Sequence, residues 1–220
     1  MEIDPAAQLG AITREVIERD HEGSPHRLVV ASRTYPNAVD DVWDALTNPQ
    51  RIPRWFLPVS GDLRAGGTYQ FEGNAGGTIT ECKPPRHLAL TWEYGGQVSW
   101  LDVHLDEDGD EATSLRLEHL LPMDDHWKQF GPGAVGVGWD LTILGLAAHL
   151  AGSEISEADL VGTPVGVAYT RGSGDAWRDA HVASGVDPED EVRRQAAAAT
   201  AAFLGEEPEG AGAPEEPEGN

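Results

Sequence analysis

The feature that most constrains this chain is a long apolar segment, Val135 to Leu150, that follows a run of short strand-like segments. Within it, Trp139, Ile143, Leu146 and Leu150 are separated by four, three and four residues, which is typical of a helix with one wide apolar stripe. A helix this apolar needs a large apolar surface to cover. The sequence therefore predicts that an open sheet lies against it.

Six segments upstream of this helix combine β-forming residues with turn signals, and together they predict an antiparallel meander. Turns that contain glycine separate them, such as Ala65-Gly-Gly67 and Gly95-Gly96. The expected strands are Val59 to Leu63, Thr68 to Glu72, Thr78 to Lys83, His87 to Tyr94, Val98 to Asp106 and Thr113 to Leu121. An earlier strand over Leu28 to Tyr35 brings the expected sheet to about seven strands.

Two short helices are expected between the first strand and the meander. Asn37 is a natural N-cap, and apolar residues at helical spacing follow it. Asn48-Pro49 predicts a second helix start, which leads towards Trp55 and Phe56. A further short helix is expected near the N-terminus, over Ala11 to Arg19.

Composition divides the chain into four parts. They are an N-terminal segment, partly ordered, over residues 1–26, the main domain over 27–151, a helical extension over 152–205 and an acidic tail over 206–220. In the extension, Ser173 is the expected start of one helix, and Asp187-Pro188-Glu189-Asp190 starts another that Gly205 ends. The tail contains only Glu, Gly, Pro, Ala and Asn, and we expect it to be disordered.

Charge and cysteine usage exclude several classes of partner and site. The chain has 38 Asp and Glu against 15 Lys and Arg, a formal net charge of −23, so nucleic acid and an anionic membrane surface would be repelled. Cys82 is the single cysteine, which excludes an internal disulfide framework and fits a reducing compartment. No signal peptide is visible, and no apolar run approaches the roughly 20 residues of a membrane span, so we expect a cytoplasmic protein.

Four motifs occur in an order that resembles a known superfamily. They are Ala38-Val-Asp-Asp-Val-Trp-Asp-Ala-Leu-Thr-Asn-Pro49, Asp62-Leu-Arg-Ala-Gly-Gly-Thr-Tyr-Gln-Phe71, Gly77-Thr-Ile-Thr-Glu-Cys-Lys-Pro-Pro-Arg-His-Leu-Ala-Leu-Thr-Trp92 and Thr113-Ser-Leu-Arg-Leu-Glu-His119. Residues 28–150 thereby resemble the START-like (SRPBCC) superfamily, in the branch named after the C-terminal domain of the heat-shock chaperone ATPase activator. The resemblance implies an α+β helix-grip (Bet v 1-like) fold, with a curved antiparallel sheet around a long C-terminal helix.

A sheet that grips a helix leaves a space between them, and folds of this kind use that space as an apolar ligand pocket. The alternation of residues along each strand and the stripe of the helix select the expected wall. The expected lining residues are Trp55, Phe56, Tyr69, Phe71, Trp92, Leu117, His119, Trp139 and Ile143. The alternative is that these side chains fill a closed core.

His119 is the titratable side chain with apolar neighbours on its strand face. It is either a core histidine satisfied by a backbone carbonyl or a tyrosine, or a polar anchor for a carbonyl or carboxylate of a ligand. His104 is placed on the solvent face with Trp100 and Asp102. The run Asp124-Asp125-His126 favours a solvated loop over a metal site. No catalytic residue, metal ligand or cofactor is therefore assigned.

The function expected from these features is non-catalytic binding of a small hydrophobic molecule. The common hydrolase, phosphate-binding and dinucleotide-binding motifs are absent from the sequence. The resemblance leaves two alternatives open: an enzyme similar to polyketide cyclases and aromatases, in which His119 would be the first residue to test, and a stress-response or co-chaperone interaction protein. The C-terminal extension is expected either to cover the mouth of the pocket or to form a homodimer contact.

Overall fold

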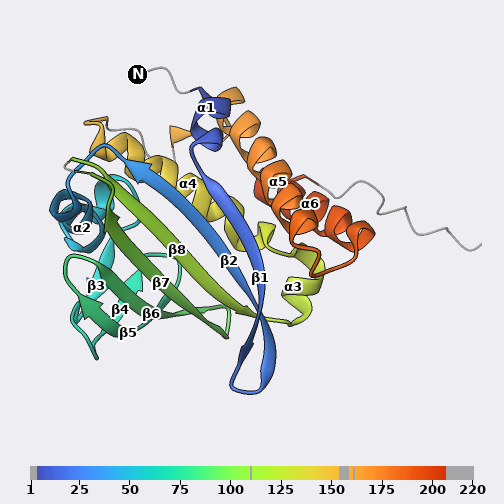
Figure 1. Ribbon diagram of the computed structural model, residues 1–220, viewed down its shortest axis with the longest axis horizontal. Coiled ribbons are helices and arrows are strands. Elements are labelled where there is room, and N and C mark those ends of the chain that lie inside the picture. Colours follow the sequence, from blue (N-terminus) through green and yellow to red (C-terminus); the bar gives the residue numbers. More distant parts are fainter. Residues whose placement is uncertain (1–3, 110, 154–158, 161, 207–220) are drawn as a thin grey trace, which may run out of the picture.

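The computed structural model describes residues 4–109, 111–153, 159–160 and 162–206. Eight antiparallel strands form one sheet in the order β1-β2-β8-β7-β6-β5-β4-β3, and the helices pack against it (Figure 1). In chain order the elements are α1 (Pro5–Gly10), β1 (Thr13–His21), β2 (Ser24–Tyr35), α2 (Val39–Thr47), the 3-10 turn η1 (Ile52–Arg54), β3 (Val59–Gly61), β4 (Thr68–Phe71), β5 (Gly76–Lys83), β6 (His87–Tyr94), β7 (Gln97–Glu107), β8 (Thr113–Pro122), α3 (Asp125–Phe130), α4 (Gly133–Leu150), α5 (Pro164–Ser184) and α6 (Glu189–Leu204). The expected α+β helix-grip fold is confirmed, with one more strand than the seven expected.

The additional strand is β1, where a helix over Ala11 to Arg19 was expected. Thr13–His21 instead pairs along its whole length with β2. A two-residue turn joins the two strands, and both of its residues, Glu22 and Gly23, have the positive φ values (53° and 79°) that tight hairpins require. The helix prediction was wrong because pairing with the adjacent strand of this hairpin outweighs the helical periodicity. The predicted boundary at residue 27 also falls inside β2.

The region after β2 differs from prediction at the start of α2 and in the length of the second helix. The N-cap of α2 is Ala38, while the Asn37 side chain donates to the Asp41 carboxylate at 3.1 Å. Asn48 ends α2 and also begins a helical turn, because its side-chain oxygen accepts a hydrogen bond from the Gln50 amide at 2.9 Å, as an N-cap does, and its carbonyl accepts the Ile52 amide at 3.0 Å. The predicted second start is therefore present, but it leads only to this turn and the 3-10 turn Ile52–Arg54.

The main hydrophobic core lies between one face of the sheet and helices α2 and α4. Helix α4 is joined to β2 by the Tyr35 hydroxyl, which donates to the Ile143 carbonyl at 3.3 Å. Gly145 lies so close to the Trp55 carbonyl that a Cβ there would overlap it. By length and composition, α4 is the one described helix that would be long and apolar enough to cross a membrane, and most of it is buried inside the protein. Its apolar sequence thus fits a core helix.

Helices α5 and α6 lie side by side beyond the β1 edge of the sheet and contact α4 (Figure 1). Helix α5 begins at Pro164, nine residues before the expected start, and the Thr163 hydroxyl caps it by accepting the Gly166 amide at 3.1 Å. Helix α6 has the predicted bounds, ending where Gly205 adopts a left-handed conformation. Of the predicted acidic tail, only Glu206 lies within the described residues, and it pairs with Arg171 at 2.6 Å.

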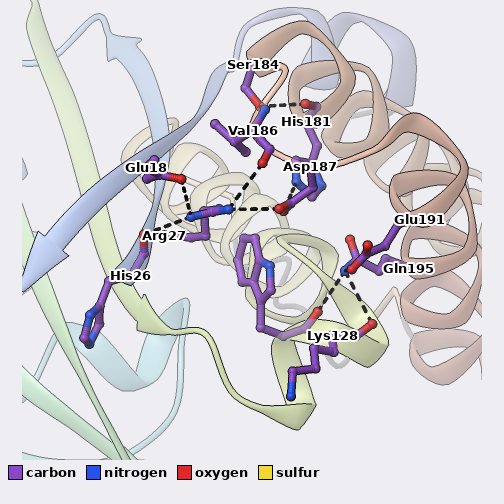
Figure 2. Close-up of polar contacts among 11 residues, drawn as sticks. Glu18, His26, Arg27, Lys128, His181, Ser184, Val186, Asp187, Glu191 and Gln195 are labelled. Atoms are coloured by element: carbon purple, nitrogen blue, oxygen red, sulfur yellow. Dashed lines mark hydrogen bonds and ion pairs between the residues drawn. The ribbon is translucent and has the colours of Figure 1, made fainter. Parts of the chain in front are cut away.

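Two ionic clusters attach these helices to the rest of the fold. In the first, Arg14 of β1 pairs with Asp140 of α4 at 2.9 Å, and the Ser173 hydroxyl of α5 donates to the same carboxylate at 2.5 Å. In the second, Arg27 of β2 and His181 of α5 both contact Asp187, each at 2.9 Å (Figure 2). The C-terminal extension is therefore joined to the sheet by buried polar contacts.

Candidate functional site

A cavity of about 600 Å³ lies between the sheet and α4. This volume is within the range of pockets that enclose drug-sized ligands. The lining residues are Phe56, Asn74, Trp92, Tyr94, Gly95, Gln97, Ser99, His119, Leu121, His126, Ala134, Val135, Gly138, Trp139, Thr142 and Phe203. Strands β6, β7 and β8 form one wall, α4 forms the opposite wall, and α6 contributes at the edge.

Two tryptophans form the aromatic part of the wall. Trp92 of β6 and Trp139 of α4 meet edge to face, with ring centroids 5.0 Å apart and planes at 64°. Behind them, Phe71 contacts Trp92 at 5.9 Å and Phe56 at 4.9 Å. Edge-to-face pairs of this kind hold the rings in place, so this part of the wall is preformed.

A chain of hydrogen bonds joins the residues that line the buried end of the cavity. The Trp139 indole N–H donates to His119 Nδ1 at 3.0 Å. His119 Nδ1 is therefore an acceptor, and the ring proton of the neutral imidazole is on Nε2. Nε2–H donates to Ser99 Oγ at 2.8 Å, and the Ser99 hydroxyl donates to the Trp92 carbonyl at 3.1 Å. Both ring nitrogens of His119 are satisfied by uncharged groups.

Burial keeps His119 neutral. The residue is 1% exposed, and desolvation lowers its pKa to about 3 from the usual 6.5. Its Nδ1 lone pair is occupied by Trp139, and its Nε2 proton points at Ser99. A histidine that activates a serine must instead accept the serine proton. The pair is thus arranged to hold the wall together, and Ser99 is not an activated nucleophile.

The outer end of the cavity reaches solvent. Tyr94 and Phe203 line it and are 61% and 41% exposed. Phe203 belongs to α6 and lies against α4, where its ring is within 3.7 Å of the position a Cβ would take on Gly138. The C-terminal extension therefore contributes Phe203 to the mouth.

The structure brings only some of the predicted lining residues to the cavity. Phe56, Trp92, His119 and Trp139 line it. The other five, Trp55, Tyr69, Phe71, Leu117 and Ile143, belong to the core around it. They share strand or helix faces with the lining residues but lie further from the open end, where neighbouring side chains fill the space. The predicted lining thus included residues of the pocket wall together with residues of the core behind it.

Sequence reasoning missed several lining residues for identifiable reasons. Ser99 lies two residues before the inward-facing Leu101 of β7 and therefore shares its face, but its hydroxyl gave no apolar signal. Val135, Gly138 and Thr142 are separated by three and four residues, and they lie on a face of α4 offset from the apolar stripe. Phe203 had no local signal, because it reaches the pocket through the packing of α6.

The run Asp124-Asp125-His126 and the single cysteine have structural roles. Asp124 caps α3 by accepting the Trp127 amide at 2.9 Å, and Asp125 pairs with Lys128 at 2.8 Å, so these carboxylates do not converge with His126 on one point. Cys82 is half-buried and packs against the core.

Comparison with known proteins identifies a family and several solved structures that are similar to this chain. Residues 37–151 match the family described as Activator of Hsp90 ATPase homolog 1-like protein (AHSA1). The crystal structure of CalU16 from Micromonospora echinospora is 33% identical, the match covers 77% of this chain and 98% of that chain, and the TM-score is 0.67. PFC0360w, an HSP90 activator from Plasmodium falciparum, is 19% identical over 57% of this chain and 96% of that chain, with a TM-score of 0.50.

DynU16, described as a putative protein in the dynemicin biosynthetic locus, is 24% identical, and the match covers 58% of this chain and 48% of that chain at a TM-score of 0.50. At these identities, DynU16 and the Plasmodium protein show similarity of fold alone. The search of curated proteins gave no match. The family match spans more than half of the chain, and CalU16 extends the similarity beyond it. This chain therefore belongs to the AHSA1 family of the SRPBCC superfamily.

Proposed function

We propose that this protein binds a small, uncharged hydrophobic molecule in the cavity between the sheet and α4, without transforming it. The observation that supports the proposal is the cavity of about 600 Å³, with aromatic walls and a fully hydrogen-bonded neutral cluster at its deep end. The paired rings of Trp92 and Trp139 favour a flat, aromatic molecule, because aromatic groups pack well against ring faces and edges.

The preference for an uncharged ligand follows from the lining. Among the described residues, no Asp, Glu, Lys or Arg lines the cavity. A charged group moved into the buried part of the site would lose its hydration without gaining a partner of opposite charge. The formal net charge of −23 adds a general repulsion for anions.

The preference for binding over catalysis rests on His119. A general base that works near neutral pH needs a pKa near that pH and a free lone pair. The pKa of His119 is about 3, and its Nδ1 lone pair accepts the Trp139 indole proton. Ser99 is fixed in the same chain of hydrogen bonds. The deep end of the pocket thus lacks a free acid–base pair among the described residues.

A thermal-shift and fluorescence screen tests the proposal. Neutral polycyclic probes such as naphthol and anthraquinone should raise the unfolding temperature, since a ligand that binds only the folded state stabilises it by mass action. They should also quench tryptophan fluorescence, because two tryptophans line the site. The matching carboxylates, naphthoate and anthraquinone carboxylate, should have much weaker effects. An absence of binding by every neutral probe would overturn the proposal.

Gly138→Leu is the informative variant. Gly138 lies in α4 and lines the cavity, and a Cβ at this position makes only ordinary contacts. The leucine side chain should fill the cavity and abolish probe binding while the fold is retained, because replacing a helical glycine favours the helix. Ala197→Leu, on the exposed surface of α6, is the matched control and should bind as the wild type does. Unchanged binding by Gly138→Leu would place the probe elsewhere.

The same samples separate the two alternatives. Turnover of a probe that His119→Gln abolishes, with the fold intact, would favour the enzyme. Capture of a chaperone by wild type and by Gly138→Leu alike would favour an interaction protein that does not use the pocket.

A further inference from the structure

A cluster of metal-ligating side chains lies on the outer face of the sheet, opposite the pocket. Its members are His87 of β6 and Asp102 and His104 of β7, and the two histidines are direct cross-strand partners. Side chains alternate along β7, so Asp102 and His104 point away from the face that carries Ser99 and Leu101. The cluster is therefore separate from the candidate ligand site.

The geometry brings three ligand atoms together. One atom from each of His87, Asp102 and His104 lies within 4.8 Å of the others. His87 Nε2 is 2.9 Å from Asp102 Oδ1, and the two histidine rings stack with centroids 4.4 Å apart and planes at 10°. Two ligand atoms bound tetrahedrally to one ion at about 2.05 Å would be about 3.4 Å apart. The His87–Asp102 spacing must therefore widen by about 0.5 Å to share an ion, a movement within the reach of the two side chains.

We propose that His87, Asp102 and His104 bind a divalent transition-metal ion of the zinc type. Two imidazoles and one carboxylate are a ligand set typical of such ions, whereas Mg²⁺ and Ca²⁺ favour oxygen ligands alone. The three residues are anchored on two neighbouring strands in the middle of the sheet, so little backbone order must be gained on binding. The remaining coordination positions would be open to water.

Binding requires one local movement. Lone pairs of an imidazole lie in the ring plane, so two stacked, nearly parallel rings do not point at one ion. Rotation of the His104 ring about its Cβ–Cγ bond corrects this, and such a torsion is soft. Within the described part of the chain, no hydrogen bond restrains the His104 ring nitrogens. In the metal-bound state the ion replaces the proton shared by His87 and Asp102.

Nearby charges are of both signs, and the cluster is open to solvent. Glu81 of β5 places a carboxylate oxygen 3.8 Å from His87 Nδ1, while its other oxygen pairs with Lys83. On the other side, Arg116 of β8 is the cross-strand partner of His104. The side chains of His87 and Asp102 are 19% and 40% exposed, so an ion can enter from solvent. The high negative charge of the chain raises the local concentration of cations.

Zinc titration of the full-length protein without an affinity tag tests the site. A competition assay with a chromogenic chelator should give one Zn²⁺ per chain. His87→Gln, His104→Gln and Asp102→Asn should each weaken binding by roughly tenfold or more, since each removes a ligand. Co²⁺ in place of Zn²⁺ should give visible ligand-field absorption that the same variants remove. Urea midpoints of the metal-free variants check that the fold is retained.

His21→Gln is the matched control. His21 and His26 form another histidine pair beside Trp100 on the outer face, with ring centroids 5.2 Å apart. This variant should bind zinc as the wild type does. The proposal is overturned if no stoichiometric binding occurs, if binding survives both His87→Gln and His104→Gln, or if His21→Gln removes it. None of these outcomes bears on the apolar pocket, which the neutral probes test separately.

Discussion

His119 and His181 are both buried, at 1% and 0% exposed, but they have partners of different charge. His119 lies between the Trp139 indole and the Ser99 hydroxyl, which are neutral. His181 contacts the Asp187 carboxylate, which also pairs with Arg27 (Figure 2). One cluster forms a pocket wall, and the other joins α5 and the start of α6 to the sheet.

The difference shows how one small fold uses buried polar groups in two ways. A neutral, satisfied cluster leaves no charge facing the cavity, which suits an uncharged ligand. The ionic clusters at Asp140 and Asp187 position helices that contribute few large apolar residues. Removing one member of a buried ion pair leaves the other charge unpaired. The two regions should therefore respond differently to substitution and to pH.

The largest effect is expected for Asp140→Ala. Asp140 is fully buried, and its loss would leave the Arg14 guanidinium, 6% exposed, without its partner. We expect a loss of about 3–5 kcal/mol in the free energy of unfolding, measured with urea. The control is Glu107→Ala, which breaks the exposed Arg86–Glu107 pair and should cost about 1 kcal/mol or less. Equal losses in the two variants would contradict the structural role of the ionic cluster.

The second largest effect is expected in the pH dependence of the free energy of unfolding. Because the pKa of His119 is about 3 in the folded protein and about 6.5 when unfolded, only the unfolded chain gains this proton between those values. Stability is therefore full above pH 6.5 and falls as the pH drops, by roughly 2 kcal/mol from pH 7 to pH 5. Burial also lowers the pKa of His181, despite Asp187, and adds a change of the same sign.

The measurement compares urea unfolding of wild type and His119→Gln at both pH values. The variant should lose the part of the pH dependence that His119 contributes, and the carboxylates common to both proteins cancel in the difference. His126→Gln, which removes an exposed histidine at the pocket, should behave as the wild type does. Parallel curves for wild type and His119→Gln would show that His119 is not held neutral by burial.

Ser99→Ala should have a smaller effect at the neutral cluster. The variant leaves His119 Nε2–H without an acceptor and the Trp92 carbonyl without its donor. A buried unsatisfied donor costs about 1–3 kcal/mol in the free energy of unfolding, less than the loss of a buried charge pair. Ser60→Ala on exposed β3 is the control and should have almost no effect. An unchanged free energy of unfolding in Ser99→Ala would contradict the importance of this hydrogen bond, because water would then be replacing the hydroxyl.

Phe203→Ala should change stability least. The ring is 41% exposed at the pocket mouth, so we expect a change of about 0.5 kcal/mol or less in the free energy of unfolding. Binding of the neutral probes should nevertheless weaken by up to roughly tenfold, because apolar contact area is lost. Val182→Ala removes an exposed apolar residue of α5 outside the pocket and should leave binding unchanged. Equal probe affinity in wild type and Phe203→Ala would exclude α6 from the binding site.

Local patterns predicted the central sheet well. The bounds of β6 are those expected from the sequence, and the end of α6 at Gly205 follows from a conformation that glycine adopts easily. His119 was also recognised as unusual, because it interrupts an apolar strand face. Prediction failed at β1, where the partner strand decides between helix and extended chain, and at the start of α5.

Periodicity within short segments was sufficient to predict the inward face of each central strand and the apolar helix that covers it, and the order of four motifs, through the resemblance they carry, was sufficient for the helix-grip fold. The folded arrangement was needed to show which of those inward residues face open space, that α6 brings Phe203 to the pocket mouth, and that His87, Asp102 and His104 meet on the outer face. Cavities and clusters of this kind arise where separate elements meet. Their positions depend on strand register and helix packing, which no local pattern specifies.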